Sequence, residues 1–174
     1  MVDWRLAGPK VLKAAFEEAP EDAPALVLAA EIAALRRGAA HARALDPDVV
    51  LFEECVEPSL ALETIERLGR VDAVVLAADD PRCTGCIAAL QEVPGLRVVS
   101  YGRAQGASVR ILDAQLYTTC SAASIQVGRE SFDMSIGAPG FERLDAALAA
   151  LAAVKALGGD VAAASARFSG VQAD

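Results

Sequence analysis

Aromatic residues are scarce in this chain, at 5% of its 174 residues, although hydrophobic residues account for 54%. Alanine supplies much of that hydrophobic content, which predicts close-packed helices against a sheet and argues against a disordered chain. The length suffices for one domain with its own core. The sequence also lacks internal repeats, low-complexity tracts and interdomain linkers, so we expect a single domain over residues 1–174, with residues 1–24 as a variable N-terminal segment.

Basic residues are too few to balance the acidic ones, since 16 Lys and Arg face 24 Asp and Glu and the formal net charge is −8. Because nucleic acids are bound by basic patches, this balance argues against a nucleic-acid partner. No apolar run approaches the roughly 18–20 residues that span a membrane. The longest run, Ala146–Val154, ends at Lys155. The N-terminus lacks a signal-peptide core, so we expect a cytoplasmic protein that does not engage a membrane.

Histidine and cysteine are also rare. His41 is the only histidine and lies between arginines on a predicted helix, so we interpret it as a surface residue. The sequence supports no Ser–His or Cys–His couple for nucleophilic catalysis. The four cysteines are too few for a disulfide scaffold, and in a reducing compartment we expect them to be thiols.

The chain is organised around residues 71–91, which read as a buried strand, an acidic turn and a helix that opens on two cysteines. Ala73–Ala77 is short and fully apolar, as parallel strands buried on both faces are. Asp79-Asp80-Pro81 ends the strand because proline fixes φ, and helical spacing resumes at Cys83–Leu90. The turn should therefore lie at the carboxyl edge of a sheet, where open α/β folds bind ligands.

Strands and helices alternate through the first part of the chain. The predicted strands are 25–29, 49–52, 73–77 and 96–101, and the predicted helices between them are 31–45, 60–68 and 83–90. This alternation implies a parallel sheet with right-handed crossovers. Apolar and polar residues then alternate singly, as in an antiparallel meander with one wet face. We predict an α/β fold, a Rossmann-like and mostly parallel sheet with flanking helices, plus a small antiparallel β-meander near 107–136.

Two further helices are predicted after the meander. The first is long, ends at Gly158-Gly159 and carries a leucine face that we interpret as core packing, namely Leu144, Leu148, Leu151 and Leu157. Asp160 is placed to cap the second helix, Val161–Phe168.

Five segments carry a family resemblance through their order and spacing: Ala78–Pro81, Val98–Gly102, Ala107–Leu112, Gly137–Ala150 and Gly158–Val171. In this order they resemble the central domain of the Mur ligases of peptidoglycan synthesis. The pattern is nearest to that of the UDP-N-acetylmuramate–alanine ligases. The resemblance is good from about Asp72 to Val171 and weaker from Ala25 to Leu68.

The resemblance implies ATP and magnesium as cofactors. Mur ligases use ATP to form an acyl phosphate on a carboxylate substrate, which an amine then attacks, and the central one of their three domains binds the nucleotide. Carried over to this chain, the remnant would be a residual nucleotide pocket formed by Asp79, Asp80, Pro139 and Gly140. The alternative is that the two aspartates only cap the strand-to-helix turn.

The parts of the family that bind phosphate and metal are largely missing. The glycine-rich loop with Gly-Lys-Ser/Thr is replaced by Gly8-Pro9-Lys10-Val11, in which proline removes a backbone donor and valine removes the metal-binding hydroxyl. The family's acidic metal-binding motif falls near Leu28–Glu31, where Glu31 is the only carboxylate. The family's histidine-asparagine pair and later asparagine fall on Glu142, Arg143 and Ala146. Phosphoryl transfer depends on such parts, so we expect no catalysis by this chain alone.

The shortened sheet predicts a partner. In the family the lost loop strand lies inside the sheet, so its loss should uncover apolar surface, which a partner usually buries. We therefore expect a pseudoenzyme, a binding or assembly module that forms a homodimer or binds a companion protein. An alternative is a remnant ATP-dependent carboxylate–amine ligase whose missing parts come from other chains.

The cysteines support a third interpretation, a thiol-dependent or metal-binding protein. Cys83-Thr-Gly-Cys86 opens a helix, whose N-terminus would lower a thiol pKa, and Cys55 follows the neighbouring strand. With Cys120 as a further thiol, a redox pair or a metal site on Cys55, Cys83 and Cys86 could result, although one CxxC without a second pair does not predict zinc. The alternative is that these cysteines are small buried hydrophobic residues.

Overall fold

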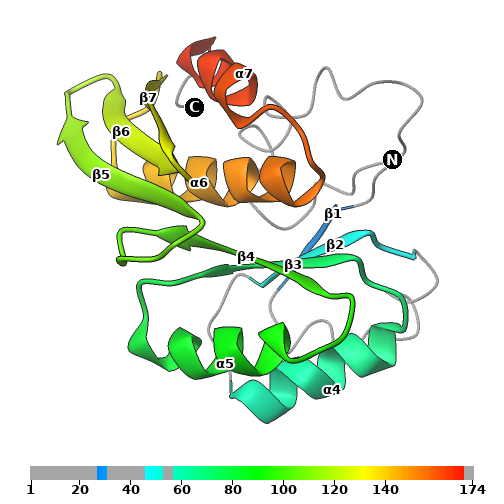
Figure 1. Cartoon of the computed structure of the whole chain (residues 1–174). Helices are drawn as coiled ribbons and strands as arrows, with labels where there is room; N and C mark the ends of the chain where they lie inside the picture. The colour runs from blue at the N-terminus through cyan, green and yellow to red at the C-terminus, as the bar shows by residue number, and fades with distance from the viewer. Residues whose placement is uncertain (1–26, 31–45, 53–56, 171–174) are drawn as a thin grey trace.

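The structure, a computed structural model, describes residues 27–30, 46–52 and 57–170. Figure 1 shows one central sheet with helices on both of its faces. The predicted helix at 31–45 lies outside the described residues, as do His41 and the segment Gly8–Val11. None of the helices in the described part of the chain is long and apolar enough to cross a membrane.

The described sheet has seven strands, and they follow one another in space as they do in sequence. They are β1 (Val27–Ala30), β2 (Val49–Phe52), β3 (Ala73–Ala77), β4 (Arg97–Gly102), β5 (Val109–Leu116), β6 (Ser121–Val127) and β7 (Glu130–Ile136). Neighbours from β1 to β5 pair in parallel, whereas β5–β6 and β6–β7 pair antiparallel. The predicted α/β fold, with its mostly parallel sheet and antiparallel meander, is confirmed.

Helices cover the two faces of the sheet unequally. On one face lie α4 (Pro58–Leu68) and α5 (Pro81–Gln91), and on the other α6 (Phe141–Ala156) and α7 (Val161–Ala166), which leads into the 3-10 turn η1 (Arg167–Gly170). Each face has a buried hydrophobic cluster. The larger cluster surrounds α6 and draws on both the parallel strands and the meander, so α6 joins the two parts of the sheet into one core.

The burial of the strands explains why their sequences differ. All four side chains of β2 are buried, and four of the five in β3 are, because helices cover both faces there. In the meander only alternate residues turn towards α6, among them Ile111, Ile125 and Met134, and their neighbours face outward. The period-2 pattern at 107–136 therefore predicts the sheet correctly.

Helix α6 is buried on almost every side. Leu144, Leu148 and Leu151 each have 0% exposure, which confirms the predicted leucine face as core. The helix ends as predicted, since Gly158 has φ +77° and the amide of Gly159 donates to the Val154 carbonyl at 2.9 Å. The Asp160 carboxylate accepts from the amide of Ala163 at 3.0 Å, so the predicted cap of α7 is also confirmed.

The step from β4 to β5 departs from the usual construction of a parallel sheet. Parallel neighbours normally need a long crossover, yet only residues 103–108 connect these two strands. They pair solely through Tyr101 with Val109 and Gly102 with Arg110, so β5 begins where β4 ends. Ser108 fixes this step, because its Oγ lies 3.2 Å from the amide of Ser100 and its amide donates to Ser100 Oγ at 3.1 Å. The meander consequently extends past the carboxyl edge of β3 and β4.

Candidate functional site

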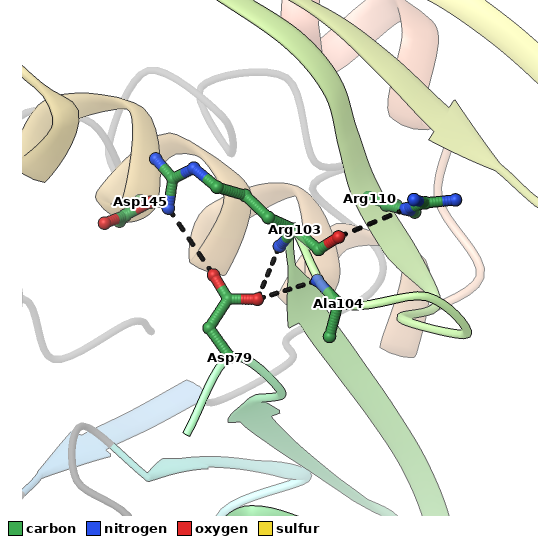
Figure 2. Close-up of polar contacts among 5 residues, drawn as sticks. All are labelled: Asp79, Arg103, Ala104, Arg110 and Asp145. Carbon is green, nitrogen blue, oxygen red and sulfur yellow. Dashed lines mark hydrogen bonds and ion pairs between the residues drawn. The ribbon is translucent and has the colours of Figure 1, made fainter. Parts of the chain in front are cut away.

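The carboxyl edge of the parallel strands holds a cluster of charged residues. Asp79 follows β3, Arg103 follows β4, and Asp145 lies in the second turn of α6. Figure 2 shows these three side chains directed towards one another from three separate elements. Residues 71–91 were predicted to present their acidic turn at this edge, and the structure places Asp79 there.

Asp79 binds the loop that follows β4. Its Oδ1 accepts from the amides of Arg103 at 2.6 Å and Ala104 at 2.8 Å, and its Oδ2 lies 3.4 Å from Nη1 of Arg103. Both oxygens of the carboxylate therefore have donors from the chain itself (Figure 2). This arrangement ties the end of β3 to the start of the β4–β5 connection.

Gly102 allows that contact to form. A Cβ atom at this position would lie 2.3 Å from Oδ1 of Asp79, well inside van der Waals contact, and φ of Gly102 is +141°. Both the space and the backbone conformation exclude a side chain. The glycine that ends β4 is thus a signal, visible in the sequence, of a close approach at the sheet edge.

Arg103 joins Asp79 to the beginning of α6. Its Nη1 lies 3.1 Å from Oδ1 of Asp145, and its guanidinium carbon lies 5.0 Å from the centre of the Phe141 ring, within the range of a cation–π contact. Burial raises the pKa of Asp145, and the charge and hydrogen bond of Arg103 oppose that rise. Arg103 and Asp145 were not predicted as site residues. They are distant in sequence from Asp79, and no local pattern marks them.

Asp80 contacts Arg82 and caps the N-terminus of α5. Its Oδ1 accepts from the amide of Arg82 at 2.9 Å, and the Arg82 side chain donates from Nε to Oδ2, also at 2.9 Å. The hydrogen bond from the Arg82 side chain is the main cause that lowers the pKa of Asp80. These contacts are those of a helix cap in a strand-to-helix turn, which was the alternative interpretation of Asp80.

Pro139 and Gly140 form the entry to α6. The amide of Gly140 donates to Oγ of Ser121 at 3.0 Å, and the same hydroxyl donates to the carbonyl of Ala138 at 3.0 Å. Ser121 is fully buried, so it fixes the turn against the start of β6. Phe141 then follows and packs under Arg103. Arg103 therefore contacts both Asp79 and the residue that follows Gly140, whereas Asp80 contacts Arg82. That Asp79, Asp80, Pro139 and Gly140 bind a nucleotide stays a prediction.

Three cysteines lie in the described part of the chain, namely Cys83, Cys86 and Cys120. Cys83 and Cys86 are each 1% exposed, and burial raises the pKa of the Cys86 thiol, opposite to the lowering expected at a helix N-terminus. Cys83 is disulfide-bonded, contrary to the expectation of free thiols, so it could bind a metal only after reduction. Cys55 lies outside the described residues. Within the described ranges no three His, Cys, Asp or Glu side chains gather as metal ligands.

Comparison with known proteins identifies the fold. No family model and no curated protein matches the sequence. Among solved structures, MurF from Acinetobacter baumannii is similar with a TM-score of 0.70 at 13% identity, over 95% of this chain and 43% of MurF. A second similar structure is a UDP-N-acetylmuramoyl-L-alanyl-D-glutamate–2,6-diaminopimelate ligase. Its TM-score is 0.65 at 18% identity, over 83% of this chain and 32% of that one.

A third similar structure, UDP-N-acetylmuramate–alanine ligase MurC from Thermotoga maritima, gives a TM-score of 0.52 at 17% identity, over 72% of this chain and 29% of that one. The chain thus has a fold like that found in Mur ligases and spans less than half the length of each of these three structures. At such low identities the similarity concerns the fold alone. The nearer match to the alanine-adding ligases stays a prediction.

Proposed function

We propose that this chain is a binding or assembly module with a Mur-ligase-like fold and that it catalyses no ligation by itself. The observation that carries the proposal is the state of the two aspartates at the sheet edge. Asp79 is engaged by the backbone and by Arg103, and Asp80 by the start of α5 and by Arg82. Their carboxylate oxygens already have donors within the chain.

Chemistry on a nucleotide would need those oxygens for another purpose. In phosphoryl-transfer sites, carboxylates and phosphate oxygens hold the magnesium ion. The protein's contribution to this chemistry is mainly to position the groups and to stabilise their charge. Here a magnesium ion would have to compete with Arg103 for Asp79 and with Arg82 for Asp80. The pseudoenzyme interpretation follows from this competition together with the replaced glycine-rich loop at Gly8–Val11.

One observation favours a second candidate, a remnant ATP-dependent ligase completed by other chains. Asp79, Arg103 and the first turns of α6 converge at the carboxyl edge of the parallel strands, and open α/β sheets bind their ligands at that edge. The activities named for the similar ligases belong to chains more than twice as long. For this chain such an activity is a hypothesis.

A thermal-shift titration with Mg-ATP and Mg-ADP separates the two candidates, with calorimetry to confirm any shift. A ligand that binds the native state raises the melting temperature by linkage. The proposed module should show no shift at millimolar nucleotide. A saturable rise that Asp80→Ala abolishes would instead support the remnant ligase. The shift within each variant is compared, because loss of the α5 cap lowers the melting temperature of Asp80→Ala without nucleotide.

We also propose that the module forms a homodimer, with a companion protein as the alternative partner. Four large hydrophobic side chains are 44–51% exposed, namely Leu112, Leu116, Tyr117 and Phe141. The bond between Ser121 and Gly140 holds the end of the β5–β6 hairpin beside the start of α6, so these apolar side chains lie on neighbouring elements. That the missing loop strand leaves apolar surface uncovered stays a prediction.

Light scattering at high micromolar concentration tests the dimer. The wild type should give twice the monomer mass, and Tyr117→Glu should shift the equilibrium towards monomer because it places a charge in the apolar surface. Thr119→Glu is the matched control, since it adds the same charge to an exposed position of the same hairpin. A strictly monomeric wild type would rule out the homodimer.

A further inference from the structure

A second polar region lies at the other end of α6 from Asp145. It is a cleft of about 400 Å³ between the β4–β5 connection, the β6–β7 turn and the last turn of α6. Its polar side chains are Ser108, Arg110, Gln126 and Lys155, and Gly106 and Gly128 form part of its wall. Neither the fold comparison nor the nucleotide prediction assigns this cleft a role.

The described residues that line the cleft bring positive charge without a compensating carboxylate. None of them is Asp or Glu, although acidic residues outnumber basic ones in the whole chain, 24 to 16. Lys155 forms no ion pair with any described residue. Arg110 donates from Nε to the carbonyl of Arg103 at 3.2 Å, and its two terminal nitrogens have no acceptor in the described part of the chain.

The geometry leaves room for a ligand beside these donors. Gly106 has φ +95° and Gly128 has φ +63°, and a Cβ atom at either position would meet no atom within 4 Å. The wall at both glycines is therefore bare backbone next to open space. Figure 2 shows Arg110 on the opposite side of the Arg103 backbone from Asp79, so its charge is not part of the Asp79 cluster.

We propose that this cleft binds a small anion that carries two negative charges, either a phosphoryl group or a dicarboxylate. The planar guanidinium of Arg110 can donate two parallel hydrogen bonds to either group, and the ammonium of Lys155 supplies a second charge. The volume lies within the range of small-molecule sites. The proposal does not depend on whether the chain has kept any ligase function.

Calorimetric titration of the full chain at constant ionic strength tests this proposal. Inorganic phosphate and succinate are the two probes, and acetate is the singly charged reference. At least one probe should bind saturably and more tightly than acetate. Arg110→Gln and Lys155→Gln should each weaken that binding by about tenfold, the effect of losing one charge-assisted contact. Binding of phosphate would identify the ligand class as a phosphoryl group, and binding of succinate would identify it as a dicarboxylate.

Arg143→Gln is the matched control, because it removes one exposed positive charge from the first turn of the same helix and leaves the cleft intact. It should change the affinity by less than about twofold. The proposal fails if neither probe binds saturably, or if the control weakens binding as much as the cleft variants do. A nucleotide-induced thermal shift lost in Arg110→Gln, but kept in Asp80→Ala, would belong to this cleft and not to the sheet edge.

Discussion

Arg103 and Arg110 lie at the two ends of the β4–β5 step, yet their surroundings differ completely. The guanidinium of Arg103 contacts the carboxylates of Asp79 and Asp145 and lies over the ring of Phe141. Among the described residues, the guanidinium of Arg110 has a single hydrogen-bond acceptor, the backbone carbonyl of Arg103, and it lines an open cleft with Lys155. The contacts within the chain explain why a charge is needed at position 103, and they leave the charge at position 110 unexplained.

The difference suggests how the two ends of α6 are used. At its beginning, the carboxylates of Asp79 and Asp145 both contact the guanidinium of Arg103, which links the helix to the sheet edge. At its end, Arg110 and Lys155 share a cleft in which none of the described lining residues is negatively charged. The first arrangement is expected to matter mainly for folding, the second mainly for binding. Three measurements can sharpen or break this comparison.

The largest effect is expected for Gly102→Ala, which should destabilise the fold by about 3 kcal/mol. The new methyl group would overlap Oδ1 of Asp79, and alanine would be strained at φ +141°. Gly106→Ala is the matched control, because φ is also positive there but space is open, and it should cost only about 1 kcal/mol. Urea unfolding monitored by circular dichroism measures both. Equal losses would mean that the Asp79 contact is not important for stability.

The second prediction exchanges each arginine for glutamine. Arg103→Gln should lower the free energy of unfolding by about 1 kcal/mol, because it removes partly exposed ion pairs and the contact with Phe141. Arg110→Gln should change it by less than about 0.5 kcal/mol. The same unfolding assay compares the two variants directly. If Arg110→Gln destabilises the fold as strongly as Arg103→Gln, Arg110 is a structural residue and the comparison fails.

Much of the fold could be predicted from the sequence because its signals are local. The apolar runs predict β2 and β3 with their observed bounds, and alternation predicts β7 at Glu130–Ile136. The helix cap at Asp160 and the helix end at Gly158 depend only on neighbouring residues, so they too could be predicted from the sequence. The order of strands follows from rules on connections, which apply to most parallel sheets.

The candidate site could be predicted only in part because its contacts are not local. Asp79 was placed at the correct edge, but its partner Arg103 comes from a different strand end, and Asp145 from a helix in the C-terminal part of the chain. The cleft likewise joins Arg110 and Lys155 through packing that no spacing rule encodes. Gly102 is the one local signal that could have pointed to the edge, because a glycine that ends a buried strand often marks a close backbone approach.

The smallest effect concerns the pH dependence of stability at Asp145. Burial raises its pKa above the ordinary value of 3.8, so the folded state binds the proton more tightly than the unfolded state does. The contribution of this carboxyl to stability must then fall as the pH rises through the window just above 3.8. The stability contribution of Asp80 has the opposite pH dependence. Its pKa is lowered in the folded state, so its contribution is lost as the pH falls.

Asp145→Asn isolates this contribution. Between about pH 3.5 and pH 6 the melting temperature of the variant should rise relative to that of the wild type, because only the wild type must ionise a partly buried carboxyl. The side chain is 46% exposed, so the change should stay near 0.5 kcal/mol, about the limit for screened surface charges. A relative fall in the Asp145→Asn melting temperature over this range would show that the ion pair with Arg103 outweighs burial, and the Asp79 cluster would then stabilise the fold more than we infer.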